Sequence, residues 1–326
     1  MVTADRFMTC DTLSMSDTSL DLQPYPMTVV IASLGGCSLK NTIESLNRGT
    51  IVPYEILVCI PLNKTLNVQN LSFPNVKILA TDCRGQVSQR AIGFQNAAHD
   101  IVMQIDDDIL VDKYCIERLL ETLKTCNAKV AVAPSLVSLS TGKSIYKRSK
   151  HNRTLLNLYY WLMNGSDGYQ PGRIDRSGSA IGIDPESEDG VLFDVEWLAG
   201  GCVMHFRENL VLKNFYPFEG KAYFEDVIHS YYLRNKGISL IVDTRACVWL
   251  DTPPSSSYGH SIFLKQLMSD FQARRYVMQL YSRRSIRIYF YYFASYLSYL
   301  YKKIIKFNVP KDYRTTVIKV DSGNKE

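Results

Sequence analysis

The chain has 326 residues, of which 46% are hydrophobic and 21% are charged. These values exclude an intrinsically disordered chain, and the length allows one large domain or one domain with an appendage. The net charge is only +5, but basic residues gather near the carboxyl end, where residues 274–314 hold ten Lys or Arg and one acid.

The first 26 residues are predicted to be a flexible leader. They are polar and rich in acids, Ser and Thr, without the basic and apolar regions of a secretory signal. The eight cysteines are scattered and form no CxxC pair, which argues against a zinc site and favours a reducing compartment. We therefore expect a cytoplasmic protein.

From Met27 onward, strand and helix patterns alternate. Apolar, β-branched runs predict strands over 27–34, 55–61, 76–80, 99–105 and 129–133. Amphipathic spacing between them predicts helices over 38–46, 84–98 and 112–127. This alternation predicts an α/β fold with a doubly wound, mostly parallel sheet flanked by helices.

The second half of the chain is less regular. A helix is predicted over 155–163, a long Gly-, Ser- and Asp-rich loop over 165–190, strands over 195–206 and 239–242, and a helix over 226–236. The pair Gly200-Gly201 interrupts an apolar run, which indicates a bulge or a close approach of another part of the chain. Residues 261–307 are predicted to be helical, aromatic and basic.

Three adjacent aspartates, Asp106, Asp107 and Asp108, end the strand predicted over 99–105. Adjacent carboxylates repel one another, and a divalent cation such as Mg²⁺ or Mn²⁺ relieves that repulsion because it prefers oxygen ligands. The carboxyl ends of strands in open α/β sheets are also where ligands bind. The triplet therefore predicts a metal site facing a phosphorylated substrate, with an exposed acidic turn as the alternative.

Two further groups are candidates for the same cleft. Glu225-Asp226 opens a predicted helix, although acids in a first turn are also expected from the helix dipole alone. Arg84 and Arg90 lie at the start of another predicted helix, where a guanidinium suits phosphate, but surface arginines are common.

The order of these pieces resembles family 2 glycosyltransferases, which have the GT-A fold. Each piece is degenerate alone, but together they cover about residues 27–252. The matching pieces are Thr28-Val29-Val30-Ile31-Ala32-Ser33, Glu55-Ile56-Leu57-Val58, residues 85–93, Asp106-Asp107-Asp108, residues 197–201 and Glu225-Asp226.

The resemblance implies a GT-A domain over 27–255, in which 27–135 bind the nucleotide sugar and 136–255 bind the acceptor. Asp226 matches the family's general base. The implied nucleotide contacts are Ser33, Arg90, Asp106 and Asp107, the implied metal ligands are Asp106, Asp108 and Asp251, and the implied acceptor contacts are Trp197, Gly200, Gly201 and Glu225.

The sequence departs from the family pattern at two places. Where relatives carry an acidic turn after the second strand, this chain reads Cys59-Ile60-Pro61-Leu62-Asn63, which leaves the identity of the nucleotide open. Many relatives also carry a late metal-binding His. Asp251, or else His260 in the segment after it, is the candidate substitute.

The resemblance implies an inverting, metal-dependent transfer of a sugar from a nucleotide sugar to a hydroxyl of a glycan, of the bacterial surface-polysaccharide type and with a lipid-linked acceptor as one option. A nucleotidyltransferase of similar fold is an alternative, although Leu34-Gly35-Gly36-Cys37-Ser38 is a poor phosphate loop. Nucleic-acid binding through the basic aromatic tail is a third reading, and we do not expect it.

Residues 256–326 are predicted to form a basic, aromatic helical extension. Its apolar stretch, Ile288–Tyr301, is shorter than the ~20 residues that span a bilayer. A helix of this composition can lie on the inner face of the cytoplasmic membrane, attracted by anionic lipids. The alternatives are a helix that packs on the core and a dimer contact, so the oligomeric state stays open.

Overall fold

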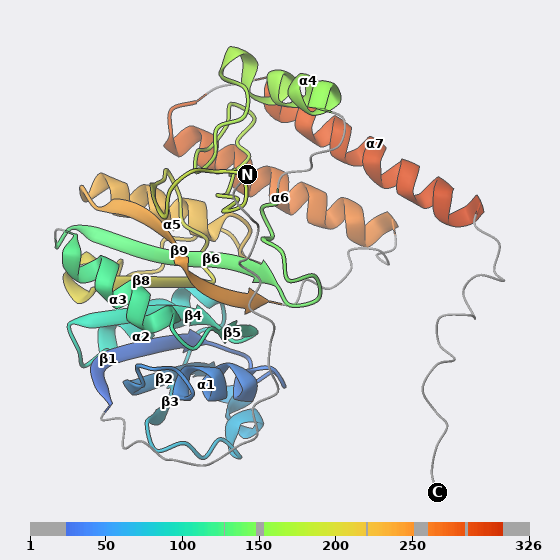
Figure 1. Ribbon diagram of the computed structural model, residues 1–326. Coiled ribbons are helices and arrows are strands. Elements are labelled where there is room, and N and C mark those ends of the chain that lie inside the picture. The colour runs from blue at the N-terminus through green and yellow to red at the C-terminus, as the bar shows by residue number, and fades with distance from the viewer. Residues whose placement is uncertain are drawn as a thin grey trace, which may run out of the picture.

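The computed structural model describes residues 24–126, 128–147, 153–219, 221–250, 260–283 and 286–308. These residues form a central sheet with helices on both faces, and the two long helices α6 and α7 lie to one side of it, above β9 in the view of Figure 1. The amino-terminal residues 1–23, which include most of the predicted leader, lie outside this set.

Within the described residues, nine strands form one sheet in the order β3-β2-β1-β4-β8-β6-β9-β5, and β7 also pairs with β9. Their bounds are β1 Tyr25–Ala32, β2 Pro53–Pro61, β3 Val76–Thr81, β4 Ile101–Asp106, β5 Ile109–Val111, β6 Val130–Ser138, β7 Leu192–Asp194, β8 Cys202–Phe206 and β9 Ser239–Leu250. The pairs β1–β2, β2–β3, β1–β4 and β6–β9 are parallel, whereas β8 runs antiparallel between β4 and β6.

The helices lie where the amphipathic pattern predicts them. Their bounds are α1 Leu39–Asn47, α2 Gln86–Asn96, α3 Cys115–Thr125, α4 Arg153–Asn164, α5 Glu225–Asn235, α6 His260–Leu280 and α7 Arg287–Asn308. Short 3₁₀ turns follow β2, α4 and β8 at Leu62–Val68, Gly165–Asp167 and Arg207–Asn209. The order of strands and helices confirms the predicted α/β class.

Buried strand residues alternate between the two faces of the sheet. Val29 and Ile31 of β1 pack in one core cluster with residues of α1 and α3, whereas Val30 packs in a second cluster with Phe94 of α2. Successive side chains of a strand point to opposite faces, so strands buried on both sides need apolar residues throughout. Helices therefore cover both faces of the sheet, as the continuous apolar runs predict.

The strand predicted over 195–206 is shorter than expected. Residues 195–201 form a loop, and the strand β8 begins only at Cys202. The Gly200-Gly201 pair marks the boundary, since glycine favours irregular backbone over regular pairing. The consequence is that this loop, and not a strand, runs beside the end of β4.

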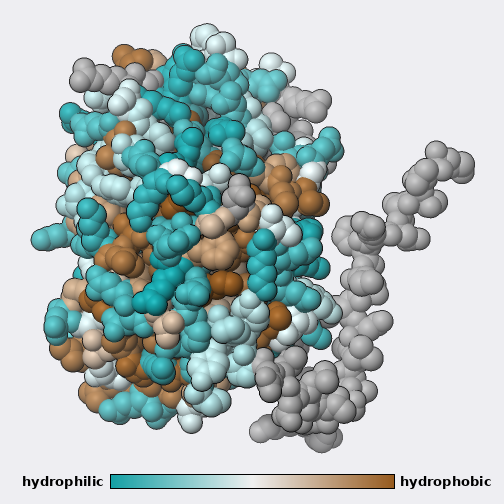
Figure 2. Space-filling model, turned by 90° about the vertical axis from the view of Figure 1, so that its left-hand side faces the viewer, coloured by the Kyte–Doolittle hydropathy of each residue, from teal (hydrophilic) through white to brown (hydrophobic). Residues whose placement is uncertain are grey.

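The carboxyl-terminal helices pack partly on the body of the protein. Val277 of α6 is buried in a cluster with Val227 and Ile228 of α5. No helix in the described part of the chain has the length and apolar character that crossing a membrane requires. The face of the molecule in Figure 2 shows hydrophilic residues with hydrophobic ones scattered among them.

Candidate functional site

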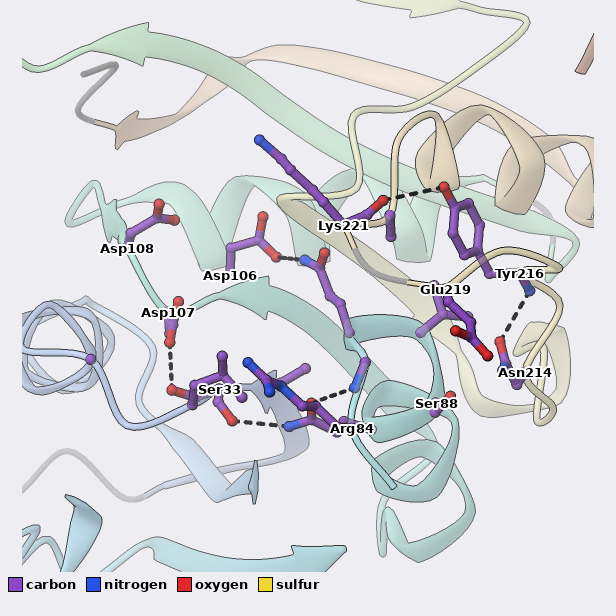
Figure 3. A pocket seen from close by; sticks show the side chains of 18 of the residues that line it. Ser33, Arg84, Ser88, Asp106, Asp107, Asp108, Asn214, Tyr216, Glu219 and Lys221 are labelled. Atoms are coloured by element: carbon purple, nitrogen blue, oxygen red, sulfur yellow. Dashed lines mark hydrogen bonds between the residues drawn. The ribbon is translucent and has the colours of Figure 1, made fainter. Parts of the chain in front are cut away.

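The aspartate triplet lines a large cleft at the end of β4. β4 ends at Asp106, which is paired in register with Ala32 at the end of the parallel strand β1. The triplet and Ser33, which follows β1, line a cleft of about 1150 Å³ (Figure 3). The sheet therefore brings Ser33 and the triplet together at the edge where open α/β sheets bind ligands.

Each aspartate of the triplet has different surroundings. Asp107 accepts a hydrogen bond from the Ser33 hydroxyl, and Asp106 accepts one from Gln86 Nε2 at 2.6 Å. Asp108 is the most exposed of the three aspartates. The partial burial that remains, together with the negative charges of Asp106 and Asp107, raises the pKa of its carboxyl group. Asp108 thus has the most accessible carboxylate of the triplet, and a bound cation would offset the repulsion from its two neighbours.

Arg90 joins the triplet to the second acidic group. Its side chain is buried, with 3% exposed, and it donates to Asp106 Oδ1 and, at 2.7 Å, to Glu225 Oε1. Burial lowers the pKa of Arg90, but the charges of Glu225 and Asp106 outweigh this and raise it above its usual value. Arg90 is therefore a fixed cation behind the cleft, with its two ends on carboxylates.

The Gly200-Gly201 pair fills the gap between the two acidic groups. The N–H of Asp106 donates to the Gly201 carbonyl at 2.9 Å, which fixes the loop to the end of β4. A Cβ at Gly200 would lie 2.7 Å from Glu225 Oε1, and one at Gly201 would lie 2.8 Å from Ile109 Cδ1, with Asp106 Oδ2 at 3.5 Å. These glycines permit the close approach that the sequence indicates, and they leave no room for a side chain.

Asp226 lies in the first turn of α5, directly after Glu225. Burial and the charge of Glu225 raise the pKa of Asp226 to about 7, although the N–H of Val227 donates to its Oδ1 at 2.9 Å. Burial also raises the pKa of Glu225, an effect that Arg90 opposes. A carboxyl group with a pKa near neutrality is suited to accept and release protons at physiological pH.

The residue before α5 has a strained backbone. Phe224, the residue before the helix, has a φ of 56° in the left-handed region, which a bulky residue rarely adopts. Such conformations persist where surrounding contacts impose them, often at functional sites. The strained turn aims the start of α5 at the glycine pair.

Three predicted residues lie elsewhere or outside the described chain. Trp197 is buried, donates from Nε1 to the Ile181 carbonyl at 3.1 Å, and packs edge-on against Tyr146. His260 begins α6, where its ring lies beside Tyr296 and Tyr299 of α7. Asp251 falls in the stretch 251–259, outside the described residues.

The carboxylates of the triplet fit a cation shared with a substrate. In the described ranges, no three His, Cys, Asp or Glu side chains converge as a complete metal cage. Mg²⁺ at nucleotide sites commonly takes only one or two carboxylates and completes its shell with phosphate oxygens and water. Two carboxylates of the triplet with a diphosphate satisfy that requirement, so the donor set fits Mg²⁺ or Mn²⁺.

The opposite wall of the cleft was not predicted. It comes from the loop before α5, which contributes Asn214, Tyr216, Glu219 and Lys221 (Figure 3). Arg84, two residues before α2, lines the same cleft. The loop has no periodic pattern, and its only sequence signal is the aromatic cluster Phe215-Tyr216-Pro217-Phe218 before Glu225.

Replacing Arg90 tests the charge bridge. Arg90→Met leaves Asp106 and Glu225 without their cation, and removal of one partner from a buried ion pair costs roughly 3–5 kcal/mol. Because Asp106 is partly exposed, we expect the lower end, a loss of about 3 kcal/mol in the free energy of unfolding, measured by urea denaturation. Arg84→Met, at an exposed position, is the control and should change it by less than about 0.5 kcal/mol. Equal effects of the two substitutions would show that the bridge is unimportant.

Comparison with known proteins places this geometry in context. Residues 28–184 match the model of a family described as glycosyl transferase family 2. GalNAc-T7, solved with UDP, GalNAc and Mn²⁺, is similar with a TM-score of 0.51 and 16% sequence identity, covering 79% of this chain and 48% of that chain. S. aureus TarS 1–349, solved with UDP-GlcNAc, has a TM-score of 0.48 and 12% identity, covering 78% of this chain and 66% of that one. No curated protein matches the sequence.

The structural likeness and the family match show different things. The likeness to GalNAc-T7, at low identity, shows a shared fold and confirms the predicted GT-A arrangement of sheet and flanking helices. This chain spans about half the length of that structure. The family match covers β1 to the loop after α4, and so includes Ser33, Arg90 and the aspartate triplet.

Proposed function

Because residues 28–184 match the model of glycosyl transferase family 2, we propose that the protein is a glycosyltransferase that moves a sugar from a nucleotide sugar to a hydroxyl of a glycan acceptor, with inversion at the anomeric carbon. The family favours this activity over nucleotidyl transfer and over nucleic-acid binding. The observation that carries the proposal is the pair of acidic groups, Asp106–Asp108 and Glu225-Asp226, on either side of the glycine pair.

The donor is proposed to bind in the large cleft. Its diphosphate would lie near the triplet, with Arg84 and Lys221 supplying positive charge from the two walls. Asp106 and Asp108 would hold Mg²⁺ or Mn²⁺ with the phosphates, and Asp251 is the proposed third ligand. When bound, the cation would neutralise charge on the departing nucleoside diphosphate. GalNAc-T7, of similar fold, was solved with UDP and Mn²⁺.

Asp226 is proposed to be the general base. It would take the proton from the acceptor hydroxyl as that oxygen attacks the anomeric carbon. Its raised pKa of about 7 suits this role, because the stronger base removes a proton more effectively and still exists in part as the anion at neutral pH. Arg90 and Glu225 would hold the start of α5 in place, and the polar groups of Ser33 and Asp107 would position the nucleotide.

Release of nucleoside diphosphate tests the activity. A panel of nucleotide sugars is incubated with the protein and Mn²⁺, and the liberated diphosphate is measured with and without candidate glycans. We expect one donor to be consumed and its consumption to increase with an acceptor. If every donor stays intact under all conditions, the proposed function is wrong.

The role in surface polysaccharide synthesis is proposed to bring the protein to an anionic membrane surface. One face of α7 carries exposed apolar residues, most of them three or four positions apart, and the chain there is strongly basic. These residues are Tyr289, Phe290, Phe293, Leu297 and Tyr301. A helix with such a face can lie in the headgroup region of anionic lipids.

Flotation with phosphatidylglycerol-containing vesicles tests the membrane contact. We expect the protein to float, and Phe293→Glu to leave it at the bottom of the gradient. Leu66→Glu, at an exposed apolar position of the 3₁₀ turn after β2, is the control and should float as the wild type does. A wild-type protein that remains at the bottom would refute the contact.

A further inference from the structure

A second pocket adjoins the turn that leads into α5. Lys221 and Ala222 line the large cleft, whereas Phe224 lines this second pocket, which has a volume of about 360 Å³. Tyr146, another wall residue, lies near enough to Asp226 that burial and the charge of that carboxyl group raise the pKa of Tyr146. The pocket is therefore near the proposed base, and it shares no lining residue with the proposed donor cleft.

Five tyrosines are among the residues that line this pocket. Tyr159 and Tyr160 come from α4 and Tyr291 from α7, and the ring of Tyr169 lies 4.8 Å from that of Tyr160, centroid to centroid. Tyrosine offers a flat apolar face and a hydroxyl at its edge. A sugar ring has the matching surface, with C–H bonds on its faces and hydroxyls around its rim.

A buried arginine supplies the polar floor. Arg274 of α6 is 3% exposed, donates from Nη1 to the Ser179 hydroxyl at 2.8 Å, and lies over the ring of Tyr291 at 3.9 Å from its centroid. The loop that carries Ser179 is held by Asp175, which accepts the N–H of Ser179 at 2.8 Å. The polar groups are thus fixed before any ligand binds, which reduces the entropic cost of binding.

Two glycines let the chain close this pocket. A Cβ at Gly182 would lie 2.3 Å from the ring of Tyr146, and one at Gly178 would lie 2.9 Å from Arg274 Cγ. The volume also falls within the ~300–1,000 Å³ of small-molecule pockets. The pocket is therefore a formed feature in which α6 and α7 supply part of the wall.

We propose that this tyrosine-lined pocket binds a pyranose ring of the acceptor, so that the carboxyl-terminal helices, which lie outside the family match, determine acceptor choice. The inference rests on the proposed function, because it places the acceptor beside Asp226. It also differs from the acceptor contacts that the sequence indicates, since Trp197 packs in the core behind Tyr146. The ring would stack on tyrosine, and Arg274 and Ser179 would contact its hydroxyls.

Saturation-transfer NMR with methyl glycosides of glucose, galactose and N-acetylglucosamine tests this pocket without catalysis. We expect ring-proton signals from at least one glycoside with the wild type, and at least a fivefold loss of signal with Tyr159→Ala. Tyr159 is 37% exposed, so its truncation leaves the fold intact, and Tyr159→Phe should keep the signal because it keeps the ring. Leu155→Ala, one turn earlier on α4 and 63% exposed, is the matched control and should bind as the wild type does.

Donor binding, followed in the same samples as the thermal shift with nucleotide sugar and Mn²⁺, separates the two proposals. A preserved donor shift with no glycoside signal, or with equal signals in wild type and Tyr159→Ala, overturns the pocket alone. A glycoside signal that depends on Tyr159, with no donor shift, supports the pocket and overturns the proposed function. Asp108→Ala should keep the glycoside signal, and its loss would show that the sugar binds in the large cleft instead.

Discussion

Asp226→Asn is expected to lower turnover about a thousandfold while leaving nucleotide-sugar binding intact. The amide is nearly the same size as the carboxyl group but cannot accept the proton of the acceptor hydroxyl. General-base catalysis contributes roughly 10²–10⁴-fold, and a thousandfold loss corresponds to about 4 kcal/mol. The substitution also removes a buried acid whose neutral form is already favoured by burial and by Glu225, so the fold should tolerate it.

The pH dependence of turnover by the wild type also tests Asp226 as the general base. The pKa of Asp226 is raised to about 7, so below pH 7 the carboxyl group is mostly protonated and cannot act as a base. Turnover at saturating substrate should therefore rise with pH and level off above about pH 8. A profile that is flat from pH 5 to pH 8 would argue against Asp226 as the base.

Two measurements on the Asn variant complete the test. Its turnover is determined on the acceptor that the wild type uses, and its donor binding is determined from the thermal shift with the nucleotide sugar. The expected result is a full donor shift with almost no transfer. Near-normal transfer by Asp226→Asn would remove this residue from the reaction.

Asp108→Ala is expected to lower activity at least about 100-fold, an effect of about 3 kcal/mol, as is chelation of divalent cations with EDTA. Asp108 is the exposed carboxylate of the triplet, whereas Ser33 already bonds Asp107, and Gln86 and Arg90 bond Asp106. It is therefore the side chain best placed to meet a cation without giving up a partner.

The two treatments should differ in their reversal. Excess Mn²⁺ should restore the EDTA-treated wild type, but should restore Asp108→Ala only in small part. Asp189→Ala, which removes an exposed acid outside the cleft, is the control and should retain activity. Full activity in EDTA, with no metal found in the protein, would contradict the proposed role of the triplet.

The sequence predicts those features of the site that each arise within a single short stretch of the chain. The apolar run before Asp106 predicts a buried strand, and the strand end then places the triplet at the ligand edge of the sheet. The pair Gly200-Gly201 predicts a close approach, and the glycines do leave room for Glu225 and Ile109. In each case the reason is local: a run of apolar residues, or the lack of a side chain.

Features that join distant segments could not be predicted in the same way. Arg90 contacts Glu225, which lies 135 positions later in the sequence. No sequence pattern near either residue indicates that the two interact. The same limit applies to β8, whose residues read as a buried strand but whose antiparallel direction follows from its place between β4 and β6. Trp197 has a motif position that indicates an acceptor contact, whereas its ring fills the core beside Tyr146.

The tyrosine-lined pocket is also a feature that joins distant segments of the chain. Its wall residues come from the segment before α4, from α4 and the loop after it, from the turn before α5, and from α6 and α7. The sequence pattern of α4, α6 and α7 shows only that these helices are aromatic. The same tyrosines fit a membrane face, a packed core or a sugar pocket. Only the fold separates these uses, with Tyr159 and Tyr291 lining the pocket and Phe293 lying on the exposed face.

Thermal-shift screening of nucleotide sugars with Mn²⁺ tests the central claim most directly, because a ligand that binds only the folded state raises the melting temperature. We predict that at least one nucleotide sugar raises the melting temperature of the wild type in Mn²⁺, that EDTA removes this shift, and that Asp108→Ala lacks it. No shift with any nucleotide sugar, or a shift of equal size in EDTA, would contradict a metal-dependent donor site at the aspartate triplet.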